Sequence, residues 1–278
     1  MRPFILATLV LLSSAVLVLF VLEGAKDKQN VKPLLEVGGK TLKDVAETTT
    51  SPIKITTLQE TKLGRQLISR FRRLPTHHPS VRRVRRIARR LVKHRSRKDI
   101  FYQVDVITSS SPNALAFPGG FILVTTGLLA LASEEDDDAE LAWVLGHEMM
   151  HIEKRHALVQ MRLWLAKKVW GRQPFNITQA GDVIEHLLRL TYSENMELEA
   201  DKGGIALMKK ADFNPKLALR LIDKMNKYFG YMKKATTQQS RNPLLIGITL
   251  TKQTLHDYLA THPHWLTRKE RLSKLLQR

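Results

Sequence analysis

The chain contains two histidines and a glutamate in the order HExxH, a spacing that can place a metal ion beside a base. His147 and His151 are four residues apart, so in a helix both imidazoles lie on one face, with Glu148 next to them. A zinc ion with three protein ligands retains a position for a water molecule, whose pKa it lowers to about 7. Glu148 could accept the proton of that water. The motif therefore predicts a zinc site for hydrolysis.

A helix must position these residues, and the sequence around them has the pattern of one. Acidic residues crowd from Glu134 to Glu140, where the positive end of the helix macrodipole would lie. Residues spaced as one buried helical face follow: Leu141, Val144, Leu145, Glu148 and Ile152.

HExxH supplies two ligands, so a third must come from another segment. The candidate is Glu197 in ENMELEAD, with Asp201 one helical turn later, placed to hydrogen-bond a ligating histidine. The same residues could form a solvated acidic helix face, and HExxH alone can arise by chance. Spacing by itself leaves these alternatives open.

Four segments in one order resemble the HtpX-like, BepA-like and CaaX-prenyl-endopeptidase group of gluzincin zinc metallopeptidases. The resemblance covers residues 101–278, through NALAFPGGFILVTTGLL, AELAWVLGHEMMHIEKRH, YSENMELEAD and THPHWLTRKERL. It implies that one zinc ion per chain is held by His147, His151 and Glu197. It also implies that Glu148 is the general base and that Asp201 is the supporting acid of an ExxxD motif.

Two positions near the motifs need separate interpretation. Glu194 stands where the group usually has arginine, so it could compete with Glu197 for the metal or point to solvent from another side of the helix. His156 also matches a position of the group. It lies beyond the face of the histidine pair, and we expect a structural role.

A small antiparallel sheet is predicted before the HExxH helix. Residues 101–107 alternate and are rich in aromatic and branched side chains, and residues 114–117 and 121–125 flank a Pro-Gly-Gly turn. An edge strand here could pair with an extended polypeptide substrate, or the hairpin could be purely structural.

The resemblance also implies three candidate residues for the cleft: Asn113, His262 and Arg268. His262 could approach the metal, stabilise a reaction intermediate, or only support the fold. Because Pro263 follows it, a role at the start of a helix is an equal alternative.

The N-terminal 25 residues are predicted to be a signal anchor or signal peptide. Residues 4–22 are an uncharged apolar run, which as a helix would span about 28 Å, close to the thickness of a bilayer's hydrocarbon core. The run is longer than a usual signal core and lacks a good cleavage site, which favours an anchor. Residues 26–60 are expected to be a tether, and 61–278 the zinc metallopeptidase domain.

The side of the membrane is less well specified. Positive charges flank both ends of the apolar run, with Arg2 before it and lysines at 26, 28 and 32 after it. The positive-inside rule therefore does not decide the orientation. No cysteine is present, which excludes lipoprotein attachment and fits an oxidising compartment. We expect the domain to lie outside the cytoplasm, in the periplasm or cell envelope.

The net charge of +19 is concentrated in one segment. Residues 61–98 contain 15 lysines and arginines and no acidic residue. An apolar stripe within them predicts a basic amphipathic helix over 80–95, whose arginines could contact anionic lipid headgroups or remain solvated. Nucleic acid is not an expected partner, because no aromatic interleaving accompanies the basic residues.

The sequence therefore predicts a mostly helical α+β fold with an active-site helix, a small antiparallel sheet and an N-terminal membrane helix. The expected function is a zinc endopeptidase that cleaves membrane-associated or misfolded envelope proteins, with the quality-control role implied by resemblance alone. One alternative is a zinc-bound, weakly active or autoinhibited chaperone-like binding protein. Another is a basic adaptor at the membrane surface.

Overall fold

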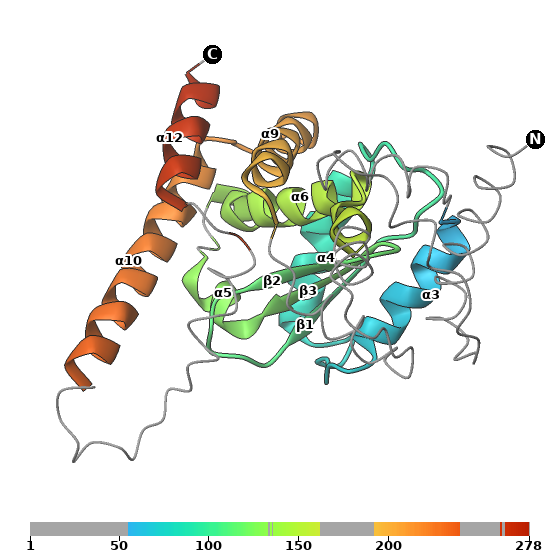
Figure 1. Ribbon diagram of the computed structural model, residues 1–278, viewed down its shortest axis with the longest axis horizontal. Helices are drawn as coiled ribbons and strands as arrows, with labels where there is room; N and C mark the ends of the chain where they lie inside the picture. The colour runs from blue at the N-terminus through green and yellow to red at the C-terminus, as the bar shows by residue number, and fades with distance from the viewer. Residues whose placement is uncertain are drawn as a thin grey trace, which may run out of the picture.

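The computed structural model describes residues 55–132, 134, 136–161, 192–239, 262 and 265–277. Its elements in chain order are α3 (Thr57–Ile68), α4 (Pro79–Val92), β1 (Gln103–Ile107), β2 (Ala114–Phe117), β3 (Phe121–Thr125), α5 (Thr126–Leu131), a short 3-10 turn (Asp136–Asp138), α6 (Ala139–Glu153), α9 (Glu194–Lys210), α10 (Leu217–Gln239) and α12 (Trp265–Leu276) (Figure 1). The described part of the chain is mostly helical with one small sheet, which confirms the predicted α+β composition.

The sheet is mixed, so the prediction of an antiparallel sheet is wrong for one strand. The strand order is β1-β3-β2. β2 pairs with β3 antiparallel, as the predicted hairpin requires, but β1 pairs with β3 parallel. The chain reverses direction twice, once between β1 and β2 and once between β2 and β3, and β3 therefore runs in the direction of β1. The alternation of side chains does not indicate which strands are neighbours.

The turn of the β2–β3 hairpin is fixed by glycine conformation and by a buried carboxylate. Gly119 and Gly120 have φ angles of 80° and 99°, in the region that favours glycine. Glu60 of α3 accepts a hydrogen bond from the Gly119 amide at 3.2 Å and a two-pronged pair from Arg97 at 2.8 Å each. This network attaches α3 to the turn.

The N-terminal predictions fall largely outside the described residues. Residues 1–54, which include the expected anchor at 4–22, are not described, and no described helix is both long and apolar enough to cross a bilayer. Ile55 and Glu60 are buried. The last residues of the expected 26–60 tether are therefore part of the packed domain.

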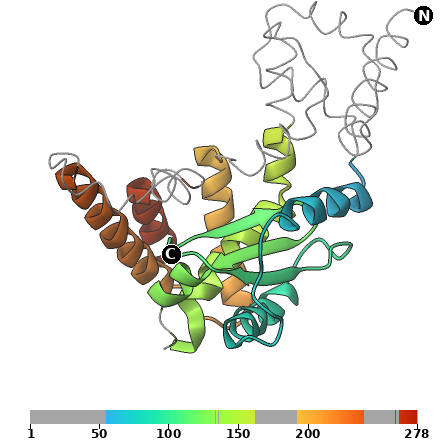
Figure 2. The same ribbon diagram turned by 90° about the horizontal axis from the view of Figure 1, so that it is seen from below.

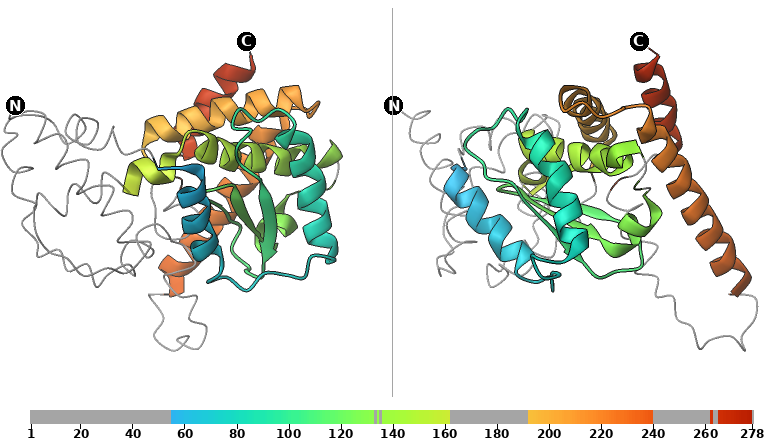
Figure 3. Two further views of the ribbon diagram at one scale, coloured as in Figure 1. Left: turned by 90° about the vertical axis from the view of Figure 1, so that its right-hand side faces the viewer. Right: turned by 180° about the vertical axis from the view of Figure 1, so that it is seen from behind.

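Helix α6, predicted from the HExxH pattern, is the central helix of the described structure. It lies between the sheet and α9 (Figures 1 and 3). Nearly all of its side chains are buried, not only the predicted stripe, because the sheet, α4, α9 and α10 all pack against it.

The acidic residues at the start of α6 act through ion pairs. Asp138 is buried and contacts Arg83 at 2.7 Å and Arg86 at 2.5 Å, and its side chain makes no cap hydrogen bond. Glu140 is fully buried and pairs with Arg220 and, at 2.8 Å, with Lys224 of α10. These carboxylates join α6 to α4 and α10.

Helix α4 is the predicted basic amphipathic helix, with slightly shorter bounds than 80–95. Its apolar stripe is buried, as expected, and consists of Val81, Val84, Ile87, Ala88 and Leu91. Four of its arginines pair with aspartates of the same chain: Arg83 and Arg86 with Asp138, Arg85 with Asp105, and Arg90 with Asp137. These four arginines therefore have carboxylate partners within the chain, and the contact of this helix with lipid stays a prediction.

Helices α10 and α12 lie side by side at one end of the molecule, and α3 lies at the opposite end (Figure 2). An ion pair of 2.5 Å between Lys269 and Asp223 links the two C-terminal helices. α12 also packs on α9 and so brings Arg268 towards the HExxH residues.

Two glycines allow α6 and α9 to approach closely. A Cβ on Gly204 would lie 2.9 Å from the backbone nitrogen of His147 and 3.2 Å from the carbonyl carbon of Gly146. These are backbone atoms, which cannot move away as a flexible side chain can. The distance between the two helices, and hence between the residues they carry, depends on this contact.

Gly204→Ala should therefore separate α6 from α9 and lower the free energy of unfolding by about 1–3 kcal/mol. Gly230→Ala in α10 is the matched control, since a Cβ there meets no atom within 4 Å, and it should raise stability by about 0.5–1 kcal/mol. Urea unfolding of both variants measures the difference. Equal stability of the two variants would contradict the close approach of α6 and α9 at Gly204.

Candidate metal centre

The described residues include one group of donors that could hold a metal ion: His147, His151, Glu197 and His262. One ligand atom from each lies within 4.8 Å of every other, and all four residues are buried. α6 supplies the two HExxH histidines, α9 supplies the carboxylate, and His262 precedes α12. The predicted ligand residues are thus brought together from separate segments.

The spacing of these atoms suits a small tetrahedral ion. Ligand atoms about 2.0–2.2 Å from a tetrahedral zinc lie roughly 3.3 Å apart. The Nε2 atoms of His147 and His151 are 3.0 Å apart, and they lie 3.5 and 3.4 Å from the oxygens of Glu197. His262 Nδ1 lies 3.3 Å from His147 Nε2 and 2.9 Å from Glu197 Oε1. The donor set fits zinc in both chemistry and spacing.

The ring of His147 is oriented by Asp201. Asp201 Oδ1 lies 2.9 Å from His147 Nδ1, which leaves Nε2 directed at the other donors. Arg268 donates to both oxygens of Asp201, at 2.9 and 2.6 Å. The structure therefore places Asp201 where an acid supporting a ligating histidine would lie.

Arg268 also neutralises Glu197. Its Nη1 lies 3.0 Å from Glu197 Oε2, and only 2% of the arginine side chain is exposed. Burial alone would raise the pKa of Glu197, but His262 and Arg268 hold it well below the usual value. For Asp201, burial also acts to raise the pKa, and Arg268 and the hydrogen bond from His147 lower it overall. Both carboxylates are thus kept charged inside the protein.

Glu148 differs from these two carboxylates. It is fully buried, and among the described residues neither of its oxygens has a hydrogen-bond partner. His262 Nε2 lies 3.4 Å from its Oε1. Burial is the main cause that raises its pKa above 4.5. A buried carboxylate without hydrogen bonds, beside a group of metal donors, is arranged to receive a water molecule or a proton.

His151 is held by residues that the spacing did not indicate. Tyr192 stacks on its ring, with centroids 3.8 Å apart and planes inclined by 21°. His156 Nδ1 lies 2.9 Å from His151 Nδ1. Both residues fall in segments that resemble the metallopeptidase group, but no periodicity or spacing distinguishes them from structural residues.

Two other residues singled out in the sequence, Glu194 and Asn113, make no described contact with the donor group. Glu194 pairs with Arg271 at 2.5 Å and is 44% exposed, and it is not part of the donor group. Asn113 is buried just before β2, and its Oδ1 accepts no hydrogen bond from the described residues. No described contact joins Asn113 to the donors, so its place in the cleft stays a prediction.

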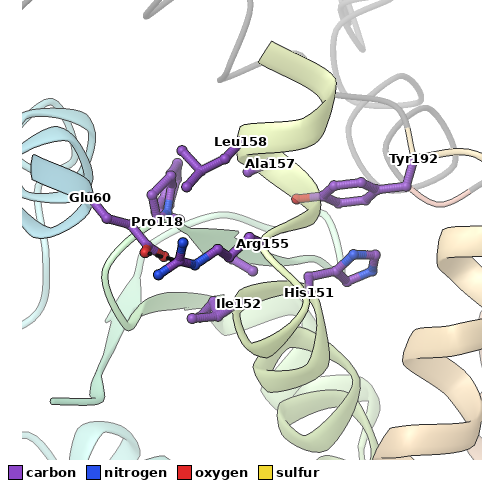
Figure 4. A pocket seen from close by; sticks show the side chains of 10 residues that line it. Glu60, Pro118, His151, Ile152, Arg155, Ala157, Leu158 and Tyr192 are labelled. Carbon is purple, nitrogen blue, oxygen red and sulfur yellow. Dashed lines mark ion pairs between the residues drawn. The ribbon is translucent and has the colours of Figure 1, made fainter. Parts of the chain in front are cut away.

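A small pocket adjoins His151 and the edge strand β2. Apolar residues form most of its wall, among them Phe117, Ile152 and Leu158. Figure 4 shows Arg155 directed towards Glu60 at one end and Tyr192 beside His151 at the other. The pocket therefore lies between a strand edge and a candidate metal ligand.

Glu148→Gln should stabilise the metal-free protein at neutral pH by about 1 kcal/mol, because it removes a buried charge that no hydrogen bond compensates. Since burial raises the folded-state pKa of Glu148 above 4.5, this cost is present at higher pH and is lost when the carboxyl is protonated. The stability difference should thus disappear as the pH falls below about 4.5. Chemical unfolding of both proteins in chelator, at neutral and at acid pH, measures it. A less stable variant at neutral pH would contradict the account of Glu148.

Curated relatives carry peptidase names. The mitochondrial metalloendopeptidase OMA1 of Schizosaccharomyces pombe is 32% identical over 177 residues, which are 62% of this chain and 52% of the relative. The metalloprotease YcaL of Escherichia coli is 30% identical over 139 residues, 46% of this chain and 52% of the relative. The putative beta-barrel assembly-enhancing protease of Vibrio cholerae is 27% identical over 157 residues, 50% and 31% of the two chains. The chain thus spans about half the length of these relatives, or less.

The family itself is established by a longer match. Residues 78–276, most of the chain, match peptidase family M48. This match confirms the class predicted from the sequence, a metallopeptidase, and together with the buried donor group it supports zinc as the cofactor. The chain belongs to peptidase family M48.

Proposed function

We propose that this chain is a zinc-dependent endopeptidase in which His147, His151 and Glu197 hold the ion and Glu148 is the general base. The observation that carries the proposal is the state of Glu148, a fully buried carboxylate that accepts no hydrogen bond from the described residues and adjoins the donor group. A structural role would give such a carboxylate hydrogen bonds, whereas the described contact of Glu148 is a single ionic one, with His262 Nε2 at 3.4 Å. A base needs free lone pairs directed at its substrate.

When bound, zinc would supply Lewis-acid activation of a water molecule and of the peptide carbonyl. Glu148 would take a proton from the water as its oxygen adds to the carbonyl carbon, and would return that proton to the amide nitrogen as the carbon–nitrogen bond breaks. The raised pKa of Glu148 suits both steps, because a carboxyl whose pKa is nearer neutrality both accepts and donates a proton. Asp201 would hold His147 in the ligating tautomer.

The cleft residues would act on the charge that develops in this reaction. Arg268 is buried against Glu197 and Asp201 and would keep both carboxylates ionised. His262 lies 3.4 Å from Glu148 and could donate a hydrogen bond to the developing oxyanion. Asn113 carries an amide oxygen without a hydrogen bond in the described structure. We propose that it meets the substrate backbone.

The substrate would be an extended polypeptide. β2 is an edge strand beside α6, and its outer edge, which pairs with no strand of the described residues, could pair with a substrate strand through backbone hydrogen bonds. Recognition through the backbone would select substrates that are unfolded or flexible, whatever their sequence. This selectivity suits proteolytic quality control of misfolded proteins.

The location is proposed from the sequence and from relatives. Residues 4–22 would anchor the chain in a membrane, with exposed arginines of α4 such as Arg82 and Arg89 near the headgroups. From the sequence we propose a domain outside the cytoplasm, in a cell envelope, and some relatives are named as beta-barrel assembly-enhancing proteases. Relatives named as mitochondrial metalloendopeptidases support a different compartment. Membrane-associated proteins are the proposed substrates.

The test compares the full-length chain with Glu148→Gln for zinc content and for cleavage of an unfolded protein such as casein. Both proteins should hold about one zinc, and turnover by the variant should fall at least a hundredfold, because the base is lost while the ligands remain. Equal cleavage by both proteins would exclude Glu148 as the base. Absence of zinc from both would contradict the ligand assignment.

His262 supports a second candidate function. Its Nδ1 lies at ligand spacing from His147 and Glu197, so it could complete a closed four-ligand zinc site. Closed sites are typical of structural zinc, whereas catalytic zinc retains an open position. The protein would then be a zinc-bound binding protein, or an enzyme inhibited at rest.

His262→Ala separates these functions. If His262 closes the site, its removal should raise the rate of casein cleavage at least several-fold, with zinc still bound by the other three residues. If His262 stabilises the oxyanion, kcat should instead fall by about ten- to a thousandfold with little change in KM. Unchanged turnover and zinc content would exclude both roles.

A further inference from the structure

The two histidines of HExxH are supported in different ways. The Nδ1 of His147 meets Asp201 directly, at 2.9 Å. Among the described residues, no carboxylate meets the Nδ1 of His151; it lies 2.9 Å from the Nδ1 of His156, a histidine that is 3% exposed. The proposed function accounts for Asp201 but gives His156 no task.

The backbone brings His156 to this position. In a continuous helix, a residue five positions after His151 would lie about 140° away around the helix axis. α6 ends at Glu153, and Arg155 has a φ of +56°, in the left-handed region that is uncommon for residues other than glycine. The chain therefore turns before it resumes helical structure at His156. This turn directs the His156 ring to the edge of His151 that faces away from the metal donors.

One arrangement of protons satisfies the hydrogen bonds that link His151, His156 and Glu199. If Nε2 of His151 gives its lone pair to the metal, the ring is protonated at Nδ1 and donates to His156 Nδ1. His156 is then protonated at Nε2, which lies 3.3 Å from Glu199 Oε2. Lys154 Nζ lies 2.6 Å from the other oxygen of Glu199.

We propose that His156 and Glu199 form a positioning relay that holds His151 in the tautomer and orientation with Nε2 towards the metal. The inference rests on the proposed role of His151 as a ligand. Tyr192 restrains the face of the ring by stacking, while the relay fixes which nitrogen carries the proton. His156 thus accepts the hydrogen bond that orients the His151 ring, as Asp201 does for His147. Glu199 is the carboxylate at the end of the relay.

The relay joins the metal site to the surface. The side chains of Lys154 and Glu199 are 44% and 47% exposed, whereas Arg268 and Asp201, which support His147, are almost fully buried. Solvent screens the outer pair, so Glu199 should contribute less than His156.

The test measures the zinc dissociation constant of the full-length chain by competition with a chelator of known affinity. His156→Phe fills the space of the ring but has no nitrogen, and it should weaken zinc binding by about 10- to 100-fold. Glu199→Leu should weaken binding by a smaller factor, and Glu199→Gln, whose amide oxygen still accepts from His156, should lie between Glu199→Leu and the parent. Glu194→Gln, on the same helix and paired only with Arg271 among the described contacts, should bind as the parent does.

A double variant distinguishes a relay from two separate structural effects. If Glu199 acts through His156, then His156→Phe combined with Glu199→Leu should bind zinc as His156→Phe does alone, because the second change removes nothing further. Additive losses in binding free energy would overturn the relay, and so would parental affinity in His156→Phe.

Melting curves of the metal-free proteins show whether each variant is folded. If His156→Phe does not fold, the zinc affinities of the two Glu199 variants test the relay, because Glu199 is half-exposed. A parent chain that binds no zinc would overturn the ligand assignment, and the relay with it, whereas a zinc-binding parent with unaffected variants would overturn the relay alone.

Discussion

The structure depends on keeping two carboxylates charged inside the protein. Glu197 and Asp201 lie one turn apart on α9, both almost without solvent contact, and a buried charge is stable only with a partner and hydrogen bonds. Arg268 supplies that partner from α12, since its guanidinium contacts both carboxylates at once. The packing of α12 on α9 is therefore a condition for the donor group, although α12 contributes no residue to it.

The same principle places several basic side chains. Arginines of α4 meet Asp138 and Asp105, and Lys224 of α10 meets Glu140. Asp138 and Glu140 flank the first turn of α6, so these pairs set the position of the helix that carries HExxH. Glu148 is the exception. Its carboxylate accepts no hydrogen bond from the described residues, and this local cost in stability fits its proposed role as the general base.

Local patterns predicted the elements better than their arrangement. The HExxH helix, the basic helix and the β2–β3 hairpin follow from periodicity and a Pro-Gly-Gly turn, which act within a few residues. The direction of β1 does not, because it depends on which strands become neighbours. The role of His156 also depends on long-range structure and on a left-handed residue at Arg155, a conformation for which an arginine gives no signal. The donor residues were predicted, whereas Tyr192 and Glu199 were not, since only their contacts distinguish them.

The proposed function depends on one arrangement, in which His147, His151 and Glu197 hold a single zinc ion beside Glu148. Diffraction from crystals of the zinc-loaded protein, measured above and below the zinc absorption edge, tests it directly. We expect one anomalous peak about 2.0–2.2 Å from Nε2 of each histidine and from a carboxylate oxygen of Glu197. A peak at any other group of residues, or none in a crystal grown with zinc, would contradict it.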